Sequence, residues 1–149
     1  MAVSGAPWTA FGAAAKRHHA DAEVLARVGR HGNADHLAGV AAECGLKAIL
    51  VGFLGGAVNA KGFPGHPAAT KPLGHLPELW GQIALAADGR SGAQFSALIL
   101  TANPFSEWEV SERYSDGAHI TSNRAADHIA EAARVIAVHE QAVIDGVLP

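Results

Sequence analysis

The sequence predicts an all-α protein, an antiparallel up-and-down bundle of four to five helices that forms a single domain over residues 1–149. Three observations support this fold class. Apolar residues recur at helical spacing in several segments, glycine, proline and asparagine breaks separate these segments, and no stretch has the pattern of a strand. With 149 residues and 49% hydrophobic composition, the chain is long enough to bury a core.

A first helix is predicted over residues 8–30, with one apolar face and a charged face opposite. His31, Gly32 and Asn33 then supply a C-terminal glycine signal and an N-cap. Because this connection is short, we expect the first two helices to pack as an antiparallel αα-hairpin.

The second predicted helix, over residues 34–54, is the central one. Its apolar side chains cover more than half of the circumference, whereas His36, Glu43 and Lys47 fall within one narrow polar sector. A helix of this composition needs neighbours on several sides. Those neighbours must also satisfy or use its polar stripe.

Irregular chain separates the remaining helices. Residues 55–74 contain five glycines and three prolines and predict a long loop, either functional or disordered. Helical spacing resumes over residues 76–87, where Pro77 is tolerated in the first turn. Residues 93–102 favour a further helix that stops before Pro104.

Residues 105–121 are irregular, and Ser122 is the predicted cap of a last helix that runs to residue 145. On this helix Arg124 is expected to face water. The predicted apolar face consists of Ala125, Ala126, Ile129, Ala132, Ala133, Ile136 and Val143.

Composition limits the classes of function. A formal net charge of -3 and a pI near 6.3 argue against a broad basic surface for duplex nucleic acid, so any RNA contact must be local. The single cysteine, Cys44, is interpreted as a small core residue and fits a reducing cytoplasm. No signal peptide or long continuous apolar run is evident, which predicts a soluble cytoplasmic protein without a membrane partner.

The densest set of reactive side chains in irregular chain precedes the last helix. Arg113 offers a planar fork for phosphate oxygens, and His119 can exchange a proton near neutral pH. Together they suit metal-free RNA cleavage, in which the ribose 2′-hydroxyl attacks its own phosphodiester. The alternative is an arginine that ties the loop to the bundle. The full set comprises Trp108, Glu109, Glu112, Arg113, Tyr114, Ser115, Asp116 and His119.

Glu43 bears on that alternative because it lies on a side of the central helix that must face a neighbour. Arg113 is a natural partner for a mostly buried carboxylate, and we expect the two to pair. The competing interpretation is an ordinary intrahelical pair between Glu43 and Lys47 at i,i+4.

No metal or cofactor site is predicted. None of the nine histidines forms a recognisable metal-ligand spacing with a second histidine or carboxylate on one helix face. Trp80 and Trp108 are interpreted as core or interface residues instead of platforms for base stacking.

The order of these features resembles the HEPN domain family over residues 10–143. The resemblance lies in KRHHADAEVL in the first helix, ADHLAGVAAECGLKAIL in the second, HLPELW at the third, and WEVSERY before an alanine-rich last helix. The AEC followed by LKA in the second helix is its most specific part, and the RY at Arg113 and Tyr114 comes next.

The resemblance implies a helical bundle that often forms homodimers. Many family members in toxin-antitoxin and antiviral defence systems are RNases that use an arginine and a histidine separated by four to six intervening residues. The RYSDGAH segment fits this spacing, so Arg113 would hold the scissile phosphate and His119 would act as general base or acid. Tyr114 departs from the polar residue common after that arginine. Ile120 and Thr121 stand where toxins silenced by a nucleotidyltransferase antitoxin often carry a tyrosine.

Two functional hypotheses follow. The first is a metal-independent HEPN endoribonuclease with RNA as substrate, an antitoxin or nucleotidyltransferase as partner, and Glu43, Lys47, Tyr114 and Asp116 as binding or supporting residues. The second is a non-catalytic HEPN-like module that binds a nucleotide or a partner protein. A small helical metalloenzyme is the third alternative, and it would require several histidines to meet in the core.

Overall fold

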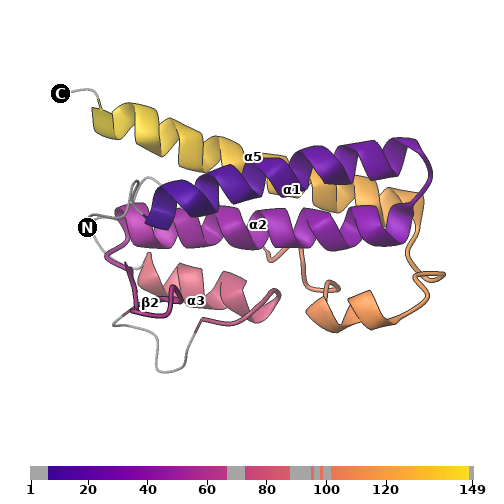
Figure 1. Ribbon diagram of the computed structural model, residues 1–149, viewed down its shortest axis with the longest axis horizontal. Helices are drawn as coiled ribbons and strands as arrows, with labels where there is room; N and C mark the ends of the chain where they lie inside the picture. The colour runs from indigo at the N-terminus through magenta and orange to yellow at the C-terminus, as the bar shows by residue number, and fades with distance from the viewer. Residues whose placement is uncertain (1–6, 67–72, 88–94, 96–97, 99–101, 148–149) are drawn as a thin grey trace.

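The computed structural model describes residues 7–66, 73–87, 95, 98 and 102–147. These residues are mostly helical, as the sequence predicts. Three long helices lie side by side, and a short helix packs against the central one (Figure 1). The long helices are α1 (Pro7–Arg27), α2 (His31–Phe53) and α5 (Ser122–Val147), and the short one is α3 (Glu78–Ala86).

The α1–α2 hairpin turns three residues earlier than the sequence analysis placed it. Gly29, with a φ of +80°, adopts the left-handed conformation that ends many helices. The N–H of Arg30 donates to the carbonyl of Leu25 at 2.9 Å, and the N–H of Gly29 donates to that of Ala26 at 3.1 Å. This Schellman motif ends α1 before the predicted stop at Gly32, so α2 begins at His31.

The central position of α2 is confirmed, because it contacts α1, α3 and α5. Leu46, Ile49 and Leu50 are fully buried in the core. By length and composition α2 is also the one helix in the described ranges that could cross a membrane, which the sequence analysis did not expect. Its apolar character has a second explanation, since 56% of the relevant window is buried inside the bundle.

The up-and-down arrangement is only partly correct. The pair α1 and α2 is antiparallel as predicted, but α2 and α5 run in the same direction (Figure 1). Three contacts in matching order establish this: Asp35 with His128, Gly45 with Val135, and Phe53 with Gly146. Residues 102–121 lead to the hairpin end of the bundle and on to α5, and Phe105 and Trp108 in this segment are buried.

The expected long loop over residues 55–74 contains a small antiparallel hairpin, β1 (Ala57–Val58) with β2 (Pro64–Gly65). The prediction of no strand was therefore wrong. Asn59 closes the turn because its side-chain oxygen accepts the N–H groups of Lys61 and Phe63. Strands of two residues are too short to produce a periodic pattern.

The third helix is confirmed, with its first turn starting after Pro77 and with Leu79, Trp80 and Ile83 buried. The helix predicted over residues 93–102 falls mostly outside the described residues. Phe95 and Leu98, which are described, are buried in the core.

The last helix is confirmed, but its buried face matches the predicted one only in part: Ala125 and Ala132 are buried as predicted, whereas Ile129, Ala133, Ile136 and Val143 are only partly buried. Thr121 is the cap instead of Ser122, since its hydroxyl oxygen accepts the N–H of Arg124 at 3.1 Å. Ala126 is exposed and Arg124 is largely buried, contrary to expectation. The buried positions follow heptad spacing and include two histidines: Ala125, His128, Ala132, Val135, His139 and Ala142.

Candidate functional site

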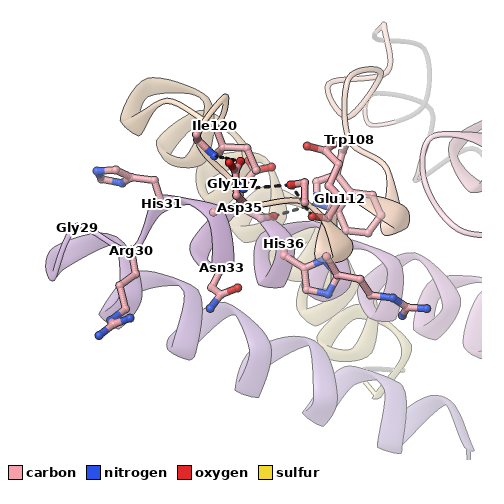
Figure 2. A pocket seen from close by; sticks show the side chains of 15 residues that line it. Gly29, Arg30, His31, Asn33, Asp35, His36, Trp108, Glu112, Gly117 and Ile120 are labelled. Carbon is pink, nitrogen blue, oxygen red and sulfur yellow. Dashed lines mark hydrogen bonds between the residues drawn. The ribbon is translucent and has the colours of Figure 1, made fainter.

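A pocket of about 420 Å³ lies at the hairpin end of the bundle, between the start of α2 and residues 108–120 (Figure 2). We call it the hairpin-end pocket. Its wall includes His31 and His36 from α2 and Arg113 and Asp116 from the opposite segment. A volume of this size is in the range of sites for small ligands.

The segment opposite α2 is shaped by local hydrogen bonds. It contains a short 3-10 helix, η2 (Val110–Tyr114), which begins with a capping box between Glu109 and Glu112. Asp116 accepts the N–H of Ala118 through its side chain at 3.0 Å, which forms an Asx turn. Gly117, with a φ of +74°, then lets the backbone approach the first turn of α2 closely at Gly32.

A network of charged side chains connects the core to this segment. Asp35, which is 1% exposed, accepts a hydrogen bond from Nδ1 of His128 at 2.5 Å. Its second oxygen lies 3.4 Å from Nε of Arg124. Arg124 donates to Glu112 at 2.6 Å, and the other oxygen of Glu112 accepts a hydrogen bond from Nε2 of His119 at 2.9 Å. The network therefore joins α2, α5 and η2.

Glu112 is held in its charged form by this network. Burial alone would raise the pKa of its carboxyl, but hydrogen bonds from His119 and Arg124 lower that pKa below its usual value. The paired carboxylate in turn fixes the orientation of the His119 ring, whose side chain remains 52% exposed.

Arg113 does not tie the segment to the core. Its guanidinium lies 4.9 Å from the centroid of the Tyr114 ring and donates one hydrogen bond to the Tyr114 hydroxyl at 3.0 Å. Both residues are exposed, Tyr114 to 79%. Most of the donor capacity of Arg113 therefore stays open to solvent and to the pocket.

The predicted pair between Glu43 and Arg113 was wrong. Glu43 accepts a hydrogen bond from the backbone N–H of Leu76 at 2.8 Å and another from Nδ1 of His75 at 3.1 Å. Glu43 pairs with these residues because it lies two turns beyond His36 on α2. The chain before α3 crosses α2 at that turn, whereas the η2 segment lies nearer the start of α2. Nor does an ion pair or side-chain hydrogen bond join Glu43 to Lys47 among the described residues.

The structure thus divides the predicted site residues. Arg113 and Asp116 line the hairpin-end pocket, and His119 is linked to its rim through Glu112. Tyr114 serves as a platform for Arg113. Glu43 and Lys47 belong to another part of α2, and no hydrogen bond joins Arg113 to His119 within the described residues.

Sequence reasoning missed four of the residues that build the site. Asp35 was not singled out because it begins an otherwise apolar helix, and His36 was recognised only as part of the polar stripe of that helix. For the residues of α5, the available signal in the sequence was the i,i+4 spacing of Arg124 and His128, which lie beside alanines. It would have placed both side chains on the face toward α2.

His36 has the most unusual environment in the pocket. Its ring stacks on Trp108 with centroids 5.7 Å apart (Figure 2), and its Nδ1 is buried without a hydrogen-bond partner in the described structure. Burial lowers the pKa of His36, and the charge of Arg113 lowers it further. His36 is therefore kept in the neutral form more than an exposed histidine.

No three His, Cys, Asp or Glu side chains in the described ranges are grouped to hold a metal ion. The chain matches no protein-family model, and no curated protein or solved structure is significantly similar to it. The HEPN assignment therefore stays a prediction from sequence motifs, and the chemistry of the site has to be inferred from its own geometry.

Proposed function

We propose that this chain is a metal-independent endoribonuclease of the HEPN type, acting as a homodimer in a toxin-antitoxin or antiviral defence setting. The observation that carries the proposal is the hydrogen bond between Glu112 and His119, which orients an exposed histidine six residues from an exposed arginine. In this proposal RNA is the substrate and the cytoplasm is the place of action. An antitoxin or nucleotidyltransferase is the expected partner.

His119 would act as the base. With Nε2 donating to the Glu112 carboxylate, the neutral ring has its lone pair on Nδ1, where it can accept the proton of a ribose 2′-hydroxyl. The resulting imidazolium is stabilised by the charge of Glu112. This is the arrangement that a general base requires, a ring nitrogen open to substrate and a second nitrogen held by a carboxylate.

Arg113 would bind the scissile phosphate through the N–H groups that it does not give to Tyr114. The 2′-oxygen then forms its bond to phosphorus and the 5′-oxygen leaves. The leaving oxygen needs a proton from an acid on the other side of the phosphate. A second copy of His119 supplies that proton if the two η2 segments face each other in a homodimer. The products are a 2′,3′-cyclic phosphate and a 5′-hydroxyl.

The test is cleavage of single-stranded RNA by the purified chain in the presence of EDTA, with cyclic phosphate identified at the new 3′ ends. Arg113→Gln and His119→Asn should each reduce the rate by about a hundredfold or more. His75→Asn is the matched control, because His75 is also an exposed histidine held by a glutamate. Full cleavage by both Arg113→Gln and His119→Asn would contradict the proposal, as would a strictly monomeric active species.

A second candidate function is a non-catalytic module that binds a nucleotide. The observation that favours it is that Arg113 lines the hairpin-end pocket whereas His119 does not. Nucleotide binding without any RNA cleavage under the same conditions would select this alternative.

A further inference from the structure

We propose that the hairpin-end pocket binds a phosphate monoester, with His36 and Arg113 as the side chains that contact it. This goes beyond the proposed RNA cleavage, because it requires neither His119 nor a second copy of the chain. The phosphate could belong to a free mononucleotide or to the 5′ end of an RNA strand, since both present the same group.

The inference starts from which hydrogen-bonding groups of the wall are already used. All three carboxylates have partners: Asp35 has His128 and Arg124, Glu112 has Arg124 and His119, and Asp116 has the N–H of Ala118. Asp35 and Glu112 are therefore engaged by basic partners, whereas Asp116 is exposed and held only by a backbone N–H. Apart from Asp116, the hydrogen-bonding groups of the wall without a partner in the described residues are N–H donors and imidazole nitrogens.

Arg113 is a positively charged donor in this wall. It donates one hydrogen bond to Tyr114, and its other N–H groups have no partner among the described residues. The imidazole nitrogens are Nδ1 of His36 and Nδ1 of His31, which are both buried and unpaired in the described structure. Buried polar atoms without a partner are rare in proteins, and a bound ion or water is one of their explanations. An arginine fork next to two imidazoles suits a phosphate.

The start of α2 adds weaker support. No side chain caps this helix, and the first backbone hydrogen bond of the helix is donated by Ala34 to the carbonyl of Arg30. The N–H groups of the three preceding residues are therefore unused, and they lie in the same wall of the pocket.

Charge balance predicts how the ligand binds. Two of the three carboxylates of the wall share one arginine, Arg124, so a phosphate dianion near Arg113 gains most when His36 takes up a proton. Binding should therefore raise the pKa of His36, which is lowered in the free protein by burial and by Arg113. The charged and titratable groups that act on His36 are Arg113 and Glu112 of η2, Asp35 and Glu43 of α2, and His18 of α1.

The experiment uses the full chain carrying His119→Asn, so that cleavage does not consume the RNA probe. The probes are inorganic phosphate, AMP, and one RNA oligonucleotide with either a 5′-phosphate or a 5′-hydroxyl. Calorimetry in two buffers of different ionisation enthalpy gives the affinity and the protons taken up, and NMR of the imidazole rings identifies the histidine that titrates.

We expect AMP to bind with proton uptake and to shift the His36 ring signals. His36→Phe keeps the aromatic stack on Trp108 and should weaken binding by about tenfold, and Arg113→Gln by at least as much. His19→Phe is the control, because His19 is half-buried on α1, does not line the pocket and is not among the groups that act on His36. Preference for AMP or for the 5′-phosphorylated oligonucleotide identifies the source of the phosphate, and either result supports the proposal.

The proposal is overturned if none of the probes binds with a dissociation constant on the order of 10 mM or below, which is the range of a weak ligand site. It is also overturned if binding leaves the His36 signals unmoved, or if the 5′-hydroxyl oligonucleotide binds as tightly as AMP and the phosphorylated oligonucleotide. The NMR titration of the unsubstituted His36 ring keeps the test decisive should His36→Phe fail to fold. Loss of RNA cleavage with retained AMP binding would refute the proposed function and leave this inference standing.

Discussion

Gly39 should be the least replaceable glycine of α2. A Cβ built at this buried position would overlap Cε2, Nε1 and Cζ2 of the Trp108 ring. Trp108 is 1% exposed and cannot move outward without breaking the hydrogen bond from its Nε1 to the carbonyl of Asp35, which is 2.9 Å long. The contact between α2 and residue 108 therefore depends on the absence of a side chain at Gly39.

The magnitude for Gly39→Ala follows from three effects. Overpacking a close contact costs about 2–3 kcal/mol. Loss or distortion of the Trp108 hydrogen bond costs about 1 kcal/mol. The better helix propensity of alanine returns up to about 1 kcal/mol. The expected net loss is about 2–3 kcal/mol in the free energy of unfolding, which corresponds to roughly 4–12 °C in Tm for a domain of this size.

Gly81→Ala is the matched control. Gly81 also lies inside a helix, α3, but a Cβ at this position meets nothing within 4 Å. It should stabilise the protein by up to about 1 kcal/mol, because only the helix propensity changes. Both variants are measured by urea and thermal unfolding, followed by circular dichroism and tryptophan fluorescence. A Gly39→Ala variant as stable as the unsubstituted chain would show that the α2–Trp108 contact is not as close as described.

Two further predictions concern the charged groups. Asp35→Asn removes the buried charge that two basic partners share and should lower the free energy of unfolding by about 2–4 kcal/mol. As a control, Asp127→Asn on the exposed face of α5 should change the free energy of unfolding by less than about 0.5 kcal/mol. Equal urea midpoints for the two variants would contradict this prediction. The pKa values of His18, His36 and His139 are each lowered by burial, so the unfolded chain binds more protons than the folded one as the pH falls toward and below 6.5. Stability should therefore decrease from pH 8 to pH 5.5, and an unchanged or higher urea midpoint at pH 5.5 would refute the burial of these rings.

Only part of the candidate site could be predicted. Arg113 and Asp116 were found because polar residues in irregular chain next to a helix start are frequent in binding sites, and both line the pocket. The partner of Glu43 was missed because it depends on which segment crosses which turn of α2. In the sequence, the chain that carries His75 and the chain that carries Arg113 are equally good candidates.

The rotation of α5 about its axis could not be obtained from its apolar pattern either. Small alanines occur on several faces of this helix, so they do not identify the buried one. Burial of His128 and His139 is decided instead by what they meet, Asp35 on α2 for the first and the start of α1 near Gly12 for the second. Polar residues enter a core when partners are present there, and a partner distant in sequence leaves no local signal.

The sequence by itself determined the helical class, the α1–α2 hairpin, the central place of α2, and the presence of the helices α3 and α5. These follow from apolar spacing and from glycine and proline breaks, which act over a few residues. The tertiary structure alone decided that α2 and α5 run parallel, that Asp35 and Arg124 connect the core to Glu112 and His119, and that a pocket opens beside His36. Its contacts join residues that are distant in the sequence, such as Asp35 and His128, which are 93 positions apart, and such pairs form only when the packed helices bring them together.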